Sequence, residues 1–216
     1  RATDTTRQPG STFKVVAAYA AALDSAGMTL ATTQYDAPYN YNGGKGRPVR
    51  NWNGENYQGW TSLRKGIEQS MNIVAVKTIT DITPALGINY LKNMGITTMQ
   101  EELKNGKNDY TQAMVLGGIT NGIKNVELTA AYATIANGGV YVTPYYIDSI
   151  KTPLGLPTYV GYGTPGERLL KSETADALKD IMRYTVETNY GDSMFPGLTV
   201  CAKTGTGEIG EEKNPN

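Results

Sequence analysis

Histidine is absent from this sequence of 216 residues, and its absence restricts the chemistry more than any other feature of the composition. Without histidine, Ser-His-Asp and Cys-His catalysis are excluded, together with every histidine-ligated metal centre. An activated serine in this chain therefore needs a lysine, a carboxylate or a tyrosine as its partner. The single cysteine, Cys201, excludes an internal disulfide and any zinc site built from several cysteines. We expect neither a bound metal nor a cofactor.

Net charge and long apolar runs are missing as well. The 20 basic and 20 acidic residues balance, so nothing marks the chain for an anionic surface, and we expect no nucleic-acid partner. The apolar stretch Val15 to Leu23 is far shorter than the ~18 residues that a membrane-spanning helix needs. The length suits one domain with a sizeable core. The 25 glycines and 15 tyrosines beside only 2 phenylalanines are typical of a loop-rich extracytoplasmic domain.

The segment Arg7-Gln8-Pro9-Gly10-Ser11-Thr12-Phe13-Lys14 is predicted to be a turn that leads into a helix. Pro-Gly breaks the backbone, Ser11 can cap the helix, and an apolar run begins immediately. Residues three apart share a helix face, so Ser11 and Lys14 would place a hydroxyl beside an amine at the end of a buried helix. The alternative is a plain capped helix with a surface lysine. Ser62-Leu63-Arg64-Lys65 repeats the same spacing, so this motif alone does not decide.

Lys203-Thr204-Gly205 is more specific, because a fixed tripeptide arises by chance far less often than Ser-x-x-Lys. It lies in Leu198 to Thr206, a β-rich run that we predict to be a strand. The lysine would supply a cation, the threonines hydroxyls, and glycine would let a backbone or a substrate approach closely. Such an edge can bind a carboxylate and pair with a peptide main chain. The alternative is an ordinary edge strand with a protective lysine.

The remaining pattern predicts a mixed α and β protein, with helices in the middle and strands toward the end. Residues 24–60 read as a long loop region with aromatic side chains, which either stack on sugars or peptide or pack against the body. Ser70-Met71-Asn72 falls at a junction between helical segments. Helices are predicted over residues 63–69, capped by Thr61 or Ser62, then 84–94, 126–136 and 173–188, the last capped by Ser172. A strand interrupted by Pro144 is predicted over 140–150 and a turn-rich connection over 155–168.

Three motifs, Ser11-Thr12-Phe13-Lys14, Ser70-Met71-Asn72 and Lys203-Thr204-Gly205-Thr206, stand in the order and rough spacing of penicillin-recognising serine enzymes. With phrases such as Leu128 to Gly139, the sequence resembles the transpeptidase domain of a penicillin-binding protein, most closely the bifunctional class A type. The resemblance runs from Arg1 to about Thr206. It implies a three-layer α-β-α fold, in which an antiparallel sheet has helices on both faces and Lys-Thr-Gly lies on an edge strand.

The same resemblance implies that residues 1–216 form a single transpeptidase domain fragment that is incomplete at both ends. Family members have sheet strands before the first motif and further strands and a terminal helix after the third. A membrane-anchored parent protein with an upstream glycosyltransferase domain is implied too. Its location would be the extracytoplasmic side of the bacterial cytoplasmic membrane.

The activity implied by the resemblance is a D,D-transpeptidase that cross-links peptidoglycan stem peptides through a serine acyl-enzyme and is inhibited by β-lactam antibiotics. Ser11 would be the nucleophile and Lys14 its base, with a pKa lowered by burial and by the cation of Lys203. Ser70 would relay the proton to the leaving amine. Asn72 would orient Lys14 and hold the amide of the donor peptide.

The third motif would bind the end of the donor peptide. Lys203 would bias the Ser70 hydroxyl, Thr204 and Thr206 would receive the terminal carboxylate, and Gly205 would allow close approach. Backbone N–H groups of Ser11 and Thr206 would form the oxyanion hole. Strict alternation along a strand puts Lys203 and Thr206 on opposite faces, so their shared site rests on the resemblance.

Other functions fit the same motifs: a D,D-carboxypeptidase, a slow β-lactamase, a β-lactam sensor, or an inactive scaffold that binds cell-wall peptide. Class A β-lactamases have Asp where Met71 stands, and their Glu-x-x-Leu-Asn phrase has no match here. The nearest candidate, Glu102-Leu103-Lys104-Asn105, lacks the leucine at the required place. We therefore expect hydrolysis of the acyl-enzyme to be slow.

Overall fold

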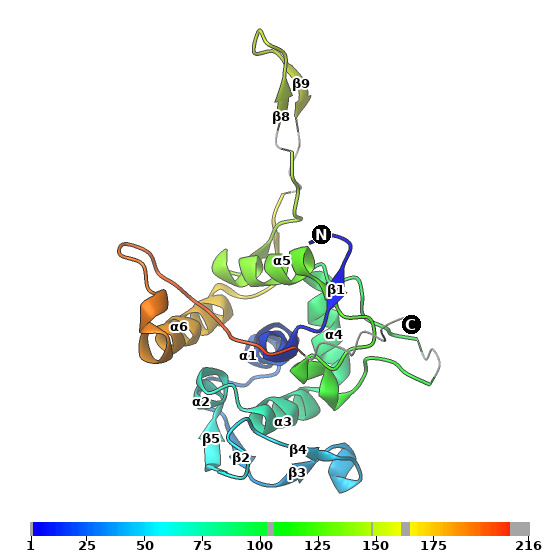
Figure 1. Ribbon diagram of the computed structural model, residues 1–216, viewed down its shortest axis with the longest axis vertical. Coiled ribbons are helices and arrows are strands. Elements are labelled where there is room, and N and C mark those ends of the chain that lie inside the picture. Colours follow the sequence, from blue (N-terminus) through cyan, green and yellow to red (C-terminus); the bar gives the residue numbers. More distant parts are fainter. Residues whose placement is uncertain (1, 103–105, 148, 161–164, 208–216) are drawn as a thin grey trace, which may run out of the picture.

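The computed structural model describes residues 2–102, 106–147, 149–160 and 165–207, so the end of the Glu102 to Asn105 phrase lies outside the described residues. The protein mixes helices with short antiparallel sheets, which confirms the predicted fold class (Figure 1). Its α-helices are α1 Ala20–Asp24, α2 Leu63–Glu68, α3 Asn72–Ile82, α4 Pro84–Asn93, α5 Asn125–Ala136 and α6 Ser172–Asn189; shorter helices are η1 Gly10–Thr12, η2 Val15–Tyr19, η3 Asn42–Gly44, η4 Gln112–Leu116 and η5 Gly191–Ser193.

Residues 10–24 form a central helix, around which the other helices are arranged (Figure 1). It begins with the 3₁₀ turn η1, continues through the π-helical segment η2 and ends as α1. Every residue from Phe13 to Ala22 is wholly buried. An apolar surface on all sides of the helix requires partners on all sides, and α3, α4 and α6 supply them.

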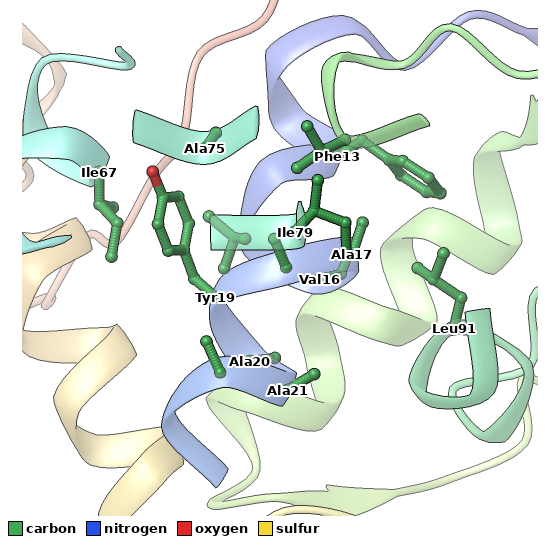
Figure 2. Close-up of a cluster of buried hydrophobic side chains, with 14 of the residues drawn as sticks. Phe13, Val16, Ala17, Tyr19, Ala20, Ala21, Ile67, Ala75, Ile79 and Leu91 are labelled. Atoms are coloured by element: carbon green, nitrogen blue, oxygen red, sulfur yellow. The ribbon is translucent and has the colours of Figure 1, made fainter. Parts of the chain in front are cut away.

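The π-helical segment Val15–Tyr19 follows directly after Lys14. Such widened turns are rare and are frequent at functional sites. Tyr19 at its end is buried, and among the described residues its hydroxyl finds no hydrogen-bond partner. Figure 2 shows that oxygen on the side of Ile67 and Ala75, among apolar groups. Burial raises the pKa of Tyr19, so the phenol stays neutral.

Two glycines let helices pack closely, Gly87 of α4 against the central helix and Gly66 of α2 against α3. A Cβ at Gly87 of α4 would collide with the backbone oxygen of Ala17, and one at Gly66 of α2 would lie 2.5 Å from Val74. Both distances are shorter than real Cβ atoms allow, so a side chain at either glycine would push the two helices apart. The α4 helix starts with Pro84 behind the Thr83 cap, as its sequence predicts.

The predicted helix ends are partly wrong. Ser62 caps α2 by accepting from Lys65 N, as expected, but Ser11 caps nothing, because it lies inside the η1 turn after Pro9. Ser172 is the first residue of α6, and Lys171 precedes it as the capping position. There the Asp24 carboxylate accepts from Lys171 N at 2.8 Å. A carboxylate from the end of the central helix thus replaces the predicted local cap.

The strands among the described residues form five two-stranded antiparallel sheets. Two of them join segments far apart in sequence, and the β8–β9 hairpin projects away from the helical body (Figure 1). The pairs are β1 Thr6–Arg7 with β6 Ile123–Lys124, β2 Thr33–Asp36 with β5 Gly59–Ser62, β3 Tyr39–Asn40 with β4 Pro48–Val49, β7 Val140–Tyr141 with β10 Glu167–Arg168, and β8 Ser149–Lys151 with β9 Pro157–Val160.

Residues 140–150 form two short strands on either side of the interruption expected at Pro144. Two strand predictions need correction. Residues 155–168, predicted as turns, contribute β9 and β10. Residues 198–206 form no strand within the part of the chain that the structure describes. A strand needs a ladder partner, and this segment is held instead by Ala202 N donating to Met182 O.

None of the helices in the described ranges combines the length and apolarity needed to cross a membrane.

Gly87→Ala should destabilise the protein by about 1–3 kcal/mol, because the added methyl collides with the backbone of the central helix. Urea unfolding would measure this as a lower midpoint at an unchanged slope. Gly191→Ala is the control, since a Cβ there meets nothing within 4 Å. Equal midpoints for the two variants would show that the helix contact is loose.

Candidate active site

The three predicted motifs meet at one cleft of about 1200 Å³. Ser11 lines it from the start of the central helix, Ser70 and Asn72 from the α2–α3 junction, and residues 204–206 from the segment after α6. Lys14 is wholly buried, and its amine and that of Lys203 both reach Ser70. The fold thus brings together every predicted site residue.

The Lys14 amine lies within hydrogen-bond distance of three oxygens of the second motif. Its Nζ lies 2.7 Å from Ser70 O, 3.2 Å from Ser70 Oγ and 2.6 Å from Asn72 Oδ1. Burial lowers the pKa of Lys14 to about 6, with a smaller contribution from the cation of Lys203. At neutral pH this amine is therefore mostly uncharged, as a general base must be.

Lys203 reaches the same serine from the opposite end of the sequence. Its Nζ lies 2.7 Å from Ser70 Oγ and 2.9 Å from Thr204 O. Burial lowers its pKa to about 8, so it keeps its proton at neutral pH. Ser70 Oγ therefore lies between an uncharged amine and a cation, an arrangement that suits proton transfer through the hydroxyl.

Ser70 adopts a left-handed backbone conformation with φ of 52°. It follows the end of α2, where Ser70 N donates to Ile67 O at 3.2 Å and Met71 N donates to Gly66 O at 2.9 Å. This pattern is the Schellman ending of a helix, and its left-handed position normally holds glycine. A serine there costs of the order of 1–3 kcal/mol of strain. The two lysines that bind its oxygens help to hold it.

The Ser11 turn is fixed by neighbours on several sides. Thr12 Oγ1 donates to Pro9 O at 2.6 Å, and the hydroxyl of the partly buried Tyr132 of α5 donates to Thr12 O at 2.7 Å. A Cβ at Gly117 would collide with Gly10 N, so the residue after η4 lies against the turn. Within the described residues the Ser11 hydroxyl has no hydrogen-bond partner. It faces the cleft free to react.

Gly205 explains how the third motif approaches the first. A Cβ at this position would lie 2.8 Å from Thr12 N and 3.0 Å from Pro9 O. A Cβ at Gly10 would collide with Thr206 O. The two segments therefore touch backbone to backbone, and their glycines are required by contact rather than by a turn alone.

The aromatic residues of the long loop region differ in burial. Tyr39, Tyr41 and Tyr57 pack against the core, whereas Trp52 and Trp60 are 74% and 73% exposed. Trp52 lines the cleft and donates its indole N–H to Gln69 O at 2.8 Å. Trp60 lies on β5 beside Tyr35, with ring centroids 5.2 Å apart.

The contribution of the loop to the second motif was not predicted from the sequence. Asn72 Nδ2 donates to Arg50 O at 2.7 Å, and Asn72 N donates to the side chain of Asn51 at 2.9 Å. The sequence offers one indication: Asn51 is a polar residue in a loop, and such a side chain is available to hydrogen-bond backbone amides elsewhere. Nothing in the local pattern shows which distant helix it meets.

Metal-ion chemistry finds no ready ligands here. In the described ranges, no group of three or more acidic, cysteine or histidine side chains is placed to hold an ion.

Comparison with known families decides the classification, since the penicillin binding protein transpeptidase domain matches residues 1–216. The chain belongs to this family. Penicillin-binding protein 1A of Streptococcus oralis is 30% identical over 218 residues, covering 100% of this chain and 33% of the relative. Penicillin-binding protein 1A/1B of Bacillus subtilis is 28% identical over 208 residues, covering 95% of this chain and 21% of the relative. The chain thus spans a third or less of these relatives.

Solved penicillin-binding proteins share the fold. The penicillin G acyl-enzyme complex of penicillin-binding protein A from M. tuberculosis superposes with a TM-score of 0.79 at 24% identity. The match covers 95% of this chain and 48% of that one. The fold of this transpeptidase family member is therefore that of the penicillin-binding proteins, as the motifs indicate.

Lys14→Met should remove a pH dependence of stability from this transpeptidase family member. The folded protein holds Lys14 at a pKa of about 6, whereas the ordinary value is 10.5. Between these values the unfolded state binds more protons. The free energy of unfolding therefore rises with pH by about 1.4 kcal/mol per unit, and this stabilisation is lost as the pH falls toward 6.

Urea unfolding between about pH 6.5 and 7.5 measures this slope below the range in which Lys203 titrates. We expect the slope to be present in the parent and in Lys65→Met, which changes an exposed lysine, and to be absent from Lys14→Met. Identical slopes in all three proteins would contradict the lowered pKa.

Proposed function

We propose that the protein is a D,D-transpeptidase that cross-links peptidoglycan stem peptides through an acyl-enzyme on Ser11. The observation that carries this proposal is the convergence of Lys14 and Lys203 on one hydroxyl, Ser70 Oγ, in the cleft that Ser11 lines. An uncharged amine and a charged amine on one relay hydroxyl match the needs of acyl transfer without histidine. Membership of the transpeptidase family supports the same conclusion.

Acylation begins when Ser11 Oγ attacks the carbonyl carbon between the two terminal D-alanines of a stem peptide. The Ser11 proton passes to the Lys14 amine, and the carbonyl oxygen becomes an oxyanion. Collapse of this intermediate breaks the peptide bond: Ser70 delivers its proton to the departing amine of D-alanine and takes up the proton held by Lys14, which leaves both groups as they began. An ester joins the shortened peptide to Ser11. An amine of a second stem peptide then attacks the ester, which forms the cross-link and frees the serine.

Each amine is suited to a different task at neutral pH. Lys14, with a pKa of about 6, can accept the Ser11 proton, and Lys203, with a pKa of about 8, remains a cation. The cation keeps the Ser70 hydroxyl polarised and opposes protonation of Lys14 before substrate arrives. The pair titrates as a coupled unit in two steps, one on each side of neutrality.

The donor peptide would be held by the third motif. Thr204 and Thr206 line the cleft and would receive the terminal carboxylate. Backbone N–H groups of Ser11 and Thr206 would bind the oxyanion, where loss of one donor typically costs about 3–4 kcal/mol. Gly205 brings these two segments into contact. Asn72 would bind the donor amide while it orients Lys14.

The partners follow from this activity. β-Lactam antibiotics would acylate Ser11 because they present a strained amide in place of the D-alanyl peptide bond. The chain would act as a single transpeptidase domain of a membrane-anchored parent protein with an upstream glycosyltransferase domain. Stem peptides would be reached on the extracytoplasmic side of the cytoplasmic membrane. The class A relatives, which are much longer than this chain, support a larger parent.

A fluorescent penicillin should label the protein covalently, and Ser11→Ala should abolish the label because the nucleophilic oxygen is gone. The matched control is Ser62→Ala, which removes the serine of the other Ser-x-x-Lys sequence and costs only the α2 cap. Gel fluorescence measures the result. Labelling that survives in Ser11→Ala would overturn the assignment of the nucleophile.

Intact mass followed over hours extends this test to the fate of the acyl-enzyme. We expect the penicilloyl mass to persist, because the sequence lacks the glutamate phrase that activates water in class A β-lactamases. Rapid loss of the adduct would indicate a β-lactamase instead.

Lys203→Ala should lower the acylation rate at least tenfold, because the cation that polarises Ser70 is removed. The rate of the parent should rise with pH up to about 6, where Lys14 loses its proton, stay level to about 8, and fall at higher pH, where Lys203 loses its proton. Without the cation of Lys203 the pKa of Lys14 is higher, so this rise should move to higher pH in the variant. Stopped-flow labelling across pH measures both effects, with Lys65→Ala as control. An unchanged rate and profile would remove Lys203 from the site.

A further inference from the structure

We propose that Asp36 and Asn51 form a buried positioning pair that sets the orientation of Asn72, and through it the base Lys14, from outside the three motifs. The inference rests on the proposed function, because it assigns a role toward the base of that reaction. Neither residue touches Lys14. Their effect would pass through two hydrogen-bonded steps, from Asp36 to Asn51 and from Asn51 to Asn72.

The first step is the start of α3. Met71 provides no side-chain cap for this helix, but the Asn51 side chain does so from a distant part of the chain. Asn51 Oδ1 accepts from Asn72 N at 2.9 Å and from Ile73 N at 3.1 Å. These are the first two amides of α3, which no helical carbonyl can satisfy. Asn51 thereby fixes the backbone of the residue whose side chain faces the base.

The second step is the orientation of the Asn72 amide. Its Nδ2 donates to Arg50 O at 2.7 Å, which leaves Oδ1 to accept from Lys14 Nζ at 2.6 Å. With the amide reversed, two oxygens would face each other at Arg50. The Asn72 NH₂ would then face the amine. The carbonyl of Arg50, placed by its neighbour Asn51, therefore selects one orientation.

This orientation matters for catalysis. An uncharged lysine has two N–H groups and one lone pair. The acceptors Asn72 Oδ1 and Ser70 O can take both N–H groups, which leaves the lone pair for the Ser11 proton. A reversed Asn72 would donate into that lone pair and block the base. The Asn72 oxygen thus keeps Lys14 available to Ser11.

Asp36 holds the pair in place. Its Oδ1 accepts from Asn51 Nδ2 at 2.8 Å and its Oδ2 accepts from Gln58 N at 2.9 Å. Asp36 is 1% exposed and Asn51 5% exposed, so water does not compete for these bonds. Both oxygens of the carboxylate face donors. Asn51 can then place only its NH₂ toward Asp36 and only its oxygen toward α3.

Exchanging the two residues tests the pair, because it reproduces every hydrogen bond. In Asp36→Asn/Asn51→Asp, the new carboxylate would accept from the α3 amides and from the new amide NH₂, whose oxygen would accept from Gln58 N. Asn51→Asp alone sets two carboxylates against each other. Asp36→Asn alone offers one oxygen to two donors. A merely structural role would show in stability, whereas a positioning role shows in the reaction.

The measurements are the acylation rate with fluorescent penicillin at about pH 7.5, where carboxyl groups are normally ionised, the thermal midpoint, and hydrogen exchange at the amides of Asn72 and Ile73. We expect each single variant to acylate at least tenfold more slowly than the parent. Faster exchange at the two amides should accompany the loss. The double variant should recover the rate to within threefold and restore protection. A pH profile should show that the single variants lose the plateau above pH 6 rather than shift it.

Glu127→Gln is the matched control. Glu127 is a buried carboxylate that accepts from Thr97 N and Oγ1 and does not line the cleft. We expect a lower thermal midpoint and an unchanged acylation rate while the variant is folded. This comparison separates loss of stability from loss of positioning.

Three outcomes would overturn the inference: folded single variants that acylate at the parent rate, a double variant that regains the midpoint but not the rate, or a double variant that does not fold. Failure of the proposed function looks different, because the parent itself would then take no label. In that case amide exchange at Asn72 and Ile73 would still test the hydrogen bonds of the pair.

Discussion

Burial of one amine, that of Lys14, is the constraint on which the rest of the structure depends. A charged lysine cannot be buried cheaply, so the protein either neutralises it or surrounds it with acceptors, and here it does both. The apolar central helix removes the amine from water, and oxygens of Ser70 and Asn72 receive its protons. The α2–α3 junction must therefore lie against the head of the central helix. The close contact at Gly87 lets α4 come near the central helix, and the close contact at Gly66 lets α2 and α3 come near each other.

The site is assembled from three segments that lie far apart in the sequence. The segment that carries the third motif has no strand partner among the described residues. It packs against Thr12 because Gly205 has no side chain to keep the two backbones apart. From the other side, Tyr132 of α5 and Gly117 after η4 hold the Ser11 turn. Precision here comes from backbone contact and short hydrogen bonds rather than from a continuous sheet. In a regular strand Lys203 and Thr206 would point to opposite faces, but the segment is not a strand, so this restriction does not apply to it.

Motif spacing was enough to predict which residues meet at the cleft, because Ser11, Lys14, Ser70 and Lys203 are recognised by residue type and order. Long amphipathic or apolar segments such as α4, α5 and α6 were predictable for the same reason, since their pattern is local. Features that depend on contacts between residues far apart in the chain were not predictable. The cap that Asp24 provides for α6, and that of Asn51 for α3, join residues far apart in the chain. Residues 198–206 have the composition of a strand, but composition alone does not show whether a partner strand lies beside them.

The left-handed backbone of Ser70 sets two demands on one position. Helix termination favours glycine or asparagine there, while the shared bond to both lysines requires a hydroxyl. Selection for thermal stability alone would therefore favour glycine at this residue, and the hydroxyl that both lysines reach would be lost without disturbing the fold. A serine in this strained conformation therefore indicates that its hydroxyl is needed, and the backbone angle shows this even where no motif is recognised. Relatives that have lost activity but kept the fold would be the place to look for glycine.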